Sequence, residues 1–430
     1  MMKKQFSILL ISTLFIATSC SSDDDNVTPE PATSATFKVT IENVFTPKTF
    51  KNNGTFDAIP PQGTQSFSFD AGKGAFLSLS TMFVKSNDLF LGFSDTGLAL
   101  YDANGNATTG DVTSQLKLWD AGTEVNEEPG NGPNQPMNQP GPNTGVDENG
   151  VIHLVSDGFT YPSTETIINI SLAHNGGTIF TVTINNVSDT STLPSPLAPG
   201  VWAIHGDQAK LFTNGANASA GMEKLAEDGD NSMMDGFLIN NSGYLSPYAP
   251  GVFAIHNNET MPIFTNNTSD NGNGLENLAE DGDPSILGAS LSSINGVSES
   301  GVFNTPEGAG APGPLLPDNS YTFTFTAEEG DYLNLALMLV ESNDLFYAFN
   351  DEGISLFNNG NAISGDMTSQ LNLWDAGTEV NEYPGAGNNQ PIRGGAGTGT
   401  NENGNVVVVV NDGFSYPSTT EAIKVTIEIQ

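Results

Sequence analysis

Three things are scarce in this chain of 430 residues, and each scarcity excludes a class of structure or partner. Cys20 is the only cysteine, so no disulfide can form within the chain. Lysine and arginine number 12 against 50 aspartate and glutamate residues, and the net charge of −38 disfavours binding to nucleic acid or anionic lipid surfaces. No segment after residue 20 is apolar enough to cross a bilayer as a helix.

The N-terminal segment has the composition of an export and attachment signal. A lysine-containing start and a short apolar run over residues 6–17 lead through small residues to Cys20. A lone cysteine at this point predicts the acylated cysteine of a bacterial lipoprotein; the alternative is an ordinary secretory signal with a stray cysteine. We expect residues 1–19 to be a signal peptide and residues 20–35 a disordered tether, which includes SDDD. The expected location is the outer membrane, lipid-anchored and exposed at the cell surface.

Internal repeats predict two tandem copies of one domain. The 14-residue segment KLWDAGTEVNEEPG (117–130) shares 12 positions with NLWDAGTEVNEYPG (372–385). The strand-like FKVTIENV (37–44) returns as FTVTINNV (180–187), and SNDLF and DGFxYPST also occur twice in the same order. We therefore predict one domain over residues 36–174 and a second over residues 177–430.

The second copy is longer because it contains a segment that is itself duplicated, at about 197–300. PGVWAIH and LAEDGD return as PGVFAIH and LAEDGD, and no counterpart precedes residue 174. Two short helices are predicted here, over Ala218–Glu227 and about Gly274–Glu280, each ending near a glycine. The prediction places this insertion, with its helices, in the second domain.

Most of the remaining pattern predicts β-strands. Phe37, Val39 and Ile41 alternate with polar residues, as expected for a strand with one buried face. Five consecutive valines at 406–410 predict a strand buried on both faces. Turn signals such as NG and DG separate these strands. The predicted class is all-β, with an antiparallel β-sandwich in each copy.

Acidic side chains gather in three recurring loops: SNDLF, WDAGTEVNE and DGFxYPST. The candidate metal ligands are Asp88, Asp120, Glu124, Glu127 and Asp157 in the first copy and Asp344, Asp375, Glu379, Glu382 and Asp412 in the second. Ca²⁺ requires several such oxygen ligands from converging loops. The alternative is that Asp120 and Asp375 accept hydrogen bonds from local backbone N–H groups and shape a turn before Gly122 and Gly377. The residues leave both interpretations open.

The chain lacks a recognisable catalytic constellation. Paired carboxylates could support glycoside hydrolysis, but there is no zinc-binding histidine motif, nucleophile elbow or phosphate-binding loop. His205 and His256 recur at the ends of predicted strands, where we expect each to make a hydrogen bond. Trp119 and Trp374 follow strand-like residues, and we expect them to anchor the core. These observations favour a protein that is not an enzyme.

The combined motifs resemble the spondin N-terminal domain, known from F-spondin and mindin in animals and from bacterial secreted proteins. The residues that carry the resemblance are SNDLF, LWDAGTE, DGFxYP, the TVTxxN strand, PGVWAIH, LFTNGANAS and LAEDGD. The resemblance covers nearly the whole chain after the tether, and the first copy departs from it by lacking the PGVxAIH segment. It implies a sandwich related to C2 domains and a Ca²⁺ site at the loops of one end. The implied ligands are Asp88, Asp120, Asp344 and Asp375, followed by Glu127, Glu382, Asp157 and Asp412.

The sequence therefore predicts a lipid-anchored surface protein with two spondin-like domains and Ca²⁺-dependent adhesion or extracellular ligand binding. Its ligand would be a glycan or a protein, with no nucleic acid, and membrane contact only through the anchor. One alternative is a structural envelope or matrix protein without a specific ligand. The other is a glycan-active enzyme that uses paired carboxylates.

Overall fold

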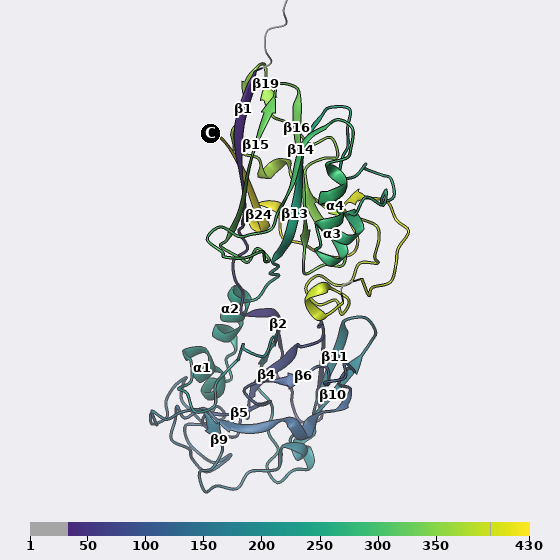
Figure 1. The fold of residues 1–430 in the computed structure, drawn as a ribbon. Coiled ribbons are helices and arrows are strands. Elements are labelled where there is room, and N and C mark those ends of the chain that lie inside the picture. Colours follow the sequence, from purple (N-terminus) through teal and green to yellow (C-terminus); the bar gives the residue numbers. More distant parts are fainter. Residues whose placement is uncertain (1–32, 396) are drawn as a thin grey trace, which may run out of the picture.

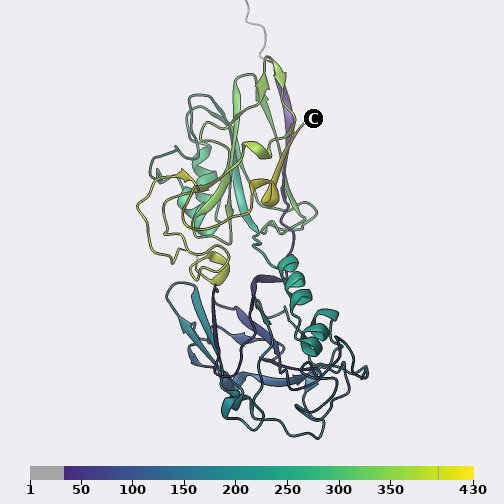
Figure 2. The ribbon, with the colours of Figure 1, turned by 180° about the vertical axis from the view of Figure 1, so that it is seen from behind.

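A computed structural model describes residues 33–395 and 397–430. The predictions for the signal peptide, Cys20 and most of the tether lie outside these residues. Strands in several antiparallel sheets make up most of the structure, together with short helices, which confirms the all-β sandwich prediction. The strands form two units, one above the other in Figures 1 and 2. Within the described part of the chain, no helix is both long and apolar enough to span a membrane.

The first unit, lower in Figure 1, packs two sheets and two helices. One sheet has the order β3-β11-β10-β7, and the other has the order β2-β12-β4-β5-β8-β9, with β6 also beside β4. The helices are α1 (Ala220–Asp228) and α2 (Ser232–Asn241). The strands are β2 (Phe50–Phe56), β3 (Thr64–Asp70), β4 (Phe76–Met82), β5 (Leu89–Gly92), β6 (Leu98–Ala99), β7 (Gly110–Asp111), β8 (Lys117–Asp120), β9 (His153–Leu154), β10 (Ile168–His174), β11 (Ile179–Asn186) and β12 (Gly200–His205).

The second unit repeats this plan with the sheet orders β15-β1-β24-β21 and β14-β13-β16-β17-β22-β23. Its helices are α3 (Leu275–Asp281), α4 (Ser285–Leu291) and α5 (Thr419–Ala422). Its strands are β1 (Ser34–Asn43), β13 (Tyr248–Asn257), β14 (Val297–Phe303), β15 (Ser320–Glu328), β16 (Asp331–Leu339), β17 (Leu345–Ala348), β18 (Ile354–Ser355), β19 (Phe357–Asn358), β20 (Asn361–Ala362), β21 (Gly365–Asp366), β22 (Asn372–Asp375), β23 (Val407–Val408) and β24 (Ile423–Ile429).

The first strand of the chain belongs to the second unit. β1 lies between β15 and β24, with Phe37 opposite Phe325 on one side and Ile429 on the other. The equivalent strand β11 lies instead between β3 and β10 of the first unit. A tight turn at 175–178 joins β10 to β11, so β11 pairs with its neighbour in sequence. The predicted boundaries 36–174 and 177–430 are therefore wrong at the two strands that the repeats match.

The segment at about 197–300 is not one insertion in the second domain, as predicted, but is divided between the two units. PGVWAIH forms β12, which pairs with β2 and β4 and precedes α1 and α2 in the first unit. PGVFAIH forms β13, which pairs with β14 and β16 and precedes α3 and α4 in the second. Each unit therefore has one strand-and-helix segment. The first unit is a circularly permuted form of the second, inserted between that unit's first two strands.

The core of each unit has two layers. One fills the space between the two sheets, and the alternating Phe37, Val39 and Ile41 lie there fully buried, as predicted. The other lies between the larger sheet and the helices and contains Trp119 in the first unit and Trp374 in the second. Both indoles are almost fully buried, which confirms their predicted role as core anchors. The core thus fixes β8 and β22, the strands that end at Asp120 and Asp375.

The valine run at 406–410 forms less strand than predicted. Only Val407 and Val408 are in β23, at the edge of the larger sheet, and Val410 is 70% exposed. A continuous apolar run is consistent with a fully buried strand, but an edge position gives it a partner on one side alone.

Candidate metal centre

Asp88 is a buried carboxylate in the turn between β4 and β5. Its Oδ2 accepts hydrogen bonds from the backbone N–H groups of Thr123 (2.8 Å) and Glu124 (3.0 Å) and from the Thr123 hydroxyl (3.2 Å). Its Oδ1 is also buried and has no hydrogen-bond partner among the described residues. An unpaired buried oxygen on an ionisable group is costly, so this atom calls for a cation or a proton.

Asp120 ends β8 and shapes the turn of the WDAGT motif. Its Oδ1 accepts from the N–H of Gly122 at 2.7 Å, and its Oδ2 accepts from the Asn126 amide at 2.6 Å. Gly122 has φ +69°, and a Cβ there would lie 2.6 Å from the backbone nitrogen of Val151. The hydrogen bond from Gly122 therefore confirms the prediction that Asp120 accepts from a local backbone N–H and shapes this turn. It does not exclude a metal, because each carboxylate oxygen has two lone pairs.

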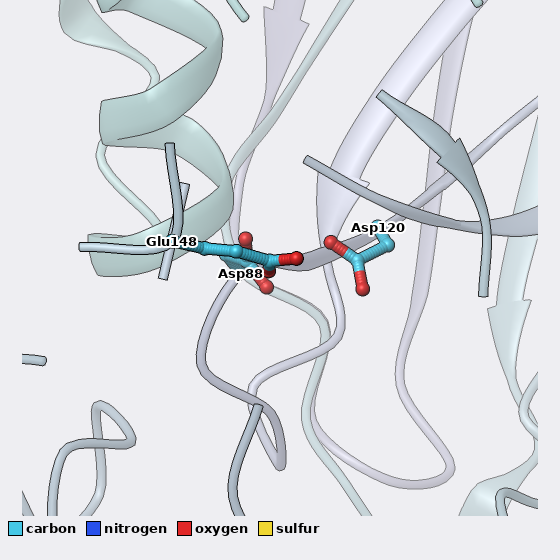
Figure 3. Close-up of side chains that lie close together, drawn as sticks. All are labelled: Asp88, Asp120 and Glu148. Atoms are coloured by element: carbon cyan, nitrogen blue, oxygen red, sulfur yellow. The ribbon is translucent and has the colours of Figure 1, made fainter. Parts of the chain in front are cut away.

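Glu148 joins these two aspartates from a third segment. The N–H of Glu148 donates to the Thr123 carbonyl at 2.9 Å, which holds its loop against the WDAGT turn. One carboxylate oxygen from each of Asp88, Asp120 and Glu148 lies within 4.8 Å of the others, and Figure 3 shows the three groups side by side. The sequence analysis missed Glu148, although Glu148-Asn149-Gly150 recurs as Glu402-Asn403-Gly404 and the repeat could have revealed it.

Burial raises the pKa of all three carboxylates, and the charge of Asp120 raises the pKa of the other two. Burial, reinforced by the charge of Asp120, raises the pKa of Asp88 to about 7 despite its backbone hydrogen bonds. Burial raises the pKa of Asp120, and burial followed by the charge of Asp120 raises that of Glu148. Without a cation, the site is therefore poorly suited to carry its full negative charge at neutral pH.

The second unit repeats the first two carboxylates. Asp344 Oδ2 accepts from the N–H groups of Thr378 (2.8 Å) and Glu379 (3.0 Å), and Asp344 Oδ1 is buried without a partner among the described residues. Asp375 accepts from the N–H of Gly377 at 2.7 Å. Burial and the charge of Asp375 raise the pKa of Asp344. Within the described part of the chain, only the first unit brings three carboxylates within 4.8 Å.

The other predicted ligands make local contacts in both units. Glu127 accepts from the backbone and side-chain amides of Asn134, and Glu382 makes the same contacts with Asn389. Glu124 and Glu379 accept hydrogen bonds from the backbone N–H groups of Gly145 and Gly399. These four glutamates hold the long loops that follow the WDAGT turns.

The aspartates of DGFxYPST organise their own motif. Asp157 accepts from the N–H of Phe159 and from the hydroxyl of Tyr161, and Asp412 does the same with Phe414 and Tyr416. Asp157 contributes to the raised pKa of Asp120. It is therefore a neighbour of the centre, and its own oxygens are occupied in the turn.

Two further acids near the centres come from the helices. Glu227, from the LAEDGD segment of α1, is 3% exposed, and burial raises its pKa to about 7. Its equivalent Glu280 in α3 is 8% exposed, and burial raises its pKa to about 7 as well. Sequence reasoning missed both, although LAEDGD occurs twice. Their charges add to those of Glu124 and Glu379.

The two recurring histidines make the expected strand-end contacts. His205 donates from Nδ1 to the Gly206 carbonyl at 2.7 Å, and its Nε2 lies 2.8 Å from the Ser78 hydroxyl. His256 Nδ1 donates to the Asn257 carbonyl at 2.8 Å. Neither histidine belongs to the carboxylate set.

The donor set fits a hard divalent cation. All the candidate ligand atoms are carboxylate oxygens from separate segments, which suits Ca²⁺ better than a metal that prefers nitrogen or sulfur. Asp88, Asp120 and Glu148 would hold the ion in the first unit, and Asp344 and Asp375 would hold it in the second. Comparison with known proteins adds no functional guide: no family model matches the chain, and a search of curated proteins finds no similar sequence.

Proposed function

We propose that this protein is a surface lipoprotein that binds an extracellular glycan or protein, as in adhesion, with Ca²⁺ ordering its acidic loops. It would have two spondin-like domains and would not be an enzyme. The lipid anchor at Cys20 and the surface location rest on the N-terminal sequence, and the spondin resemblance rests on the recurring motifs.

One observation carries the calcium part of the proposal. Asp88 Oδ1 and Asp344 Oδ1 are buried without a partner among the described residues, at equivalent positions in both units, while the second oxygen of each carboxylate is bonded to backbone N–H groups. A fold that needed these aspartates only to shape a turn would leave no reason for an ionisable oxygen to be buried and unpaired. A bound cation supplies that partner.

Calorimetric titration of Ca²⁺ into EDTA-stripped and dialysed protein tests the metal. We expect heat from both units in the wild type, loss of one unit's contribution in Asp88→Asn or Asp344→Asn, and none in the double variant. Glu165→Gln, which removes an exposed charge far from SNDLF and WDAGT in sequence, is the matched control. Equal heat in all variants, or none in any, would contradict the proposal.

The binding role needs a separate test. Arrays of glycans and extracellular proteins are probed with the protein in Ca²⁺ and in EDTA. Retention that requires Ca²⁺ and is lost in the double aspartate variant supports ligand binding. Absence of retention in both conditions favours the structural envelope protein.

A further inference from the structure

The two units meet at a small cavity whose charged residues are mostly basic. The cavity has a volume of about 120 Å³ and is lined by both units. Twelve lysine and arginine residues include Lys3 and Lys4, so 12 − 2 = 10 lie in the described range, and Lys51, Lys73 and Arg393 line this cavity. Asp70 is the only acid among the described residues that line the cavity, although acids outnumber bases by 50 to 12 in the chain. Such a concentration of scarce cations requires an explanation.

Nearby acids neutralise only part of this positive charge. Glu341 lies beside the cavity and accepts from Arg393 at 3.0 Å and from Lys51 at 3.4 Å. Asp70 accepts from the Thr178 hydroxyl at 2.6 Å. Lys73 makes no ion pair with any described residue within 4.0 Å. Three cations therefore lie beside two carboxylates. The end of the Lys73 side chain lies close to Gly105, and its ammonium has no acidic partner among the described residues.

The cavity is built by close packing between the units. The side chain of Asn388 accepts from the backbone N–H of Lys73 at 2.8 Å and donates to the Tyr101 hydroxyl at 3.1 Å. Gly72 packs so tightly that a Cβ there would lie 2.0 Å from the Ala386 carbonyl oxygen. Figure 2 shows the loop that holds these second-unit residues reaching onto the first unit. A site that is formed before binding loses less entropy when it takes a ligand.

The corresponding turn in the second unit has the opposite charge. The turn between β3 and β4 contains Lys73 between two glycines, whereas the turn between β15 and β16 contains Glu329 and is flanked by Glu328 and Asp331. The basic cavity is thus specific to the junction and is not a property that the repeated fold requires.

We propose that this junction cavity binds the carboxylate of a compact organic anion, either a free small acid or an acidic sugar. Lys51 and Lys73 supply ammonium groups. The Arg393 guanidinium already donates to Glu341, to Gln390 and to the Gly385 carbonyl, and it adds positive charge beside them. Ala71, Ala75 and Ile204 in the lining give an apolar wall for a short carbon skeleton. The volume of about 120 Å³ limits the bound part of the ligand to a small group. The site is separate from the metal centre and does not depend on Ca²⁺.

The experiment follows backbone amide signals of isotope-labelled protein by NMR, with EDTA present throughout. Lactate and glucuronate are the probes, and glucose is the uncharged control. We expect saturable shifts at Gly72–Ala75 with at least one acid and none with glucose. Lactate alone identifies a free small acid, and glucuronate identifies an acidic sugar. Raising the salt concentration weakens either interaction.

Lys73→Met is the decisive variant, because Lys73 is exposed and its loss does not disturb the core. It should weaken binding about fivefold or more, as expected for one lost charge contact. Lys117→Met, an exposed lysine on β8, should change nothing. The proposal is overturned if neither acid gives saturable shifts, if glucose binds as well, or if Lys73→Met binds as tightly as the wild type.

Discussion

Replacing Asp88 with asparagine should have opposite effects on stability in the absence and presence of Ca²⁺. Asparagine keeps an oxygen that can accept from the N–H groups of Thr123 and Glu124, but it removes the negative charge at the unpaired Oδ1. In EDTA, the variant should therefore be more stable than the wild type. In Ca²⁺, it should be less stable, because it lacks a ligand for the ion.

In EDTA, the size of the stability difference between the variant and the wild type follows from the pKa of Asp88, which is raised from 3.8 to about 7. A carboxyl group with a raised folded-state pKa binds its proton more tightly in the folded protein, so stability falls as the pH rises from about 4 to about 7. At about 1.4 kcal/mol per pKa unit, the ionised group costs up to about 4 kcal/mol at pH 7.5. Asparagine carries no charge, so the variant avoids this cost. Its neutral amide oxygen accepts weaker hydrogen bonds than a carboxylate, which reduces the net gain in stability.

In Ca²⁺, the size of the stability difference follows from how much the bound ion stabilises the folded wild type. An ion at one hundred times its dissociation constant stabilises the folded state by about 2.7 kcal/mol, and the variant should gain little of this at the first unit. Urea unfolding at pH 7.5 in EDTA and in Ca²⁺ measures both differences. The reasoning is refuted if Asp88→Asn is less stable than the wild type by the same margin in both conditions.

Three further predictions concern the architecture. Deleting residues 34–43 should abolish the calorimetric transition of the second unit and leave that of the first, because β1 lies inside the second unit's sheet. Gly122→Ala should destabilise the first unit by about 1–3 kcal/mol through its positive φ and a close backbone contact, and urea unfolding measures this loss. Glu341→Gln should leave the Arg393 charge poorly compensated at the junction and lower the free energy of unfolding by roughly 3 kcal/mol, with the calorimetric transitions of the two units moving apart. An unchanged calorimetric profile in the first or third case would contradict the corresponding interpretation.

The local structure was predictable where a pattern in the sequence sets it directly. The alternation in β1 identified its buried face, and the position of Trp119 after strand-like residues identified a core anchor. Pairing was not predictable in the same way, because FKVTIENV and FTVTINNV are nearly interchangeable in side-chain character. Chain connectivity decides between them, since β11 follows β10 through a tight turn, whereas the strand that follows β1, which is β2, pairs in the first unit.

The two buried carboxylates of the candidate site were predictable from the sequence. Asp88 and Asp120 lie in motifs that recur with their neighbours, and the structure places them together. Glu148 lies in an exposed segment outside the three recurring motifs on which the sequence analysis relied, so its carboxylate was overlooked. Glu127 and Asp157 were equally acidic and equally repeated, but neither belongs to the set of three carboxylates that lie within 4.8 Å of one another, and their oxygens accept from Asn134, Phe159 and Tyr161. Charge and recurrence do not show which carboxylates converge in space.

The insertion of the first unit after β1 determines the order in which this chain can fold. β1 leaves the ribosome first, but its partners β15 and β24 follow only after the whole first unit, a wait on the order of tens of seconds at usual rates of synthesis. Meanwhile β3 is synthesised with an edge that β11 will later fill. β1 and β11 have similar sequences, so nothing in the side chains of β1 excludes it from that edge before β11 is synthesised. β11 follows its partner β10 directly in sequence, whereas the sheet of the second unit needs β1, β15 and β24 together and cannot be complete before β24 is synthesised.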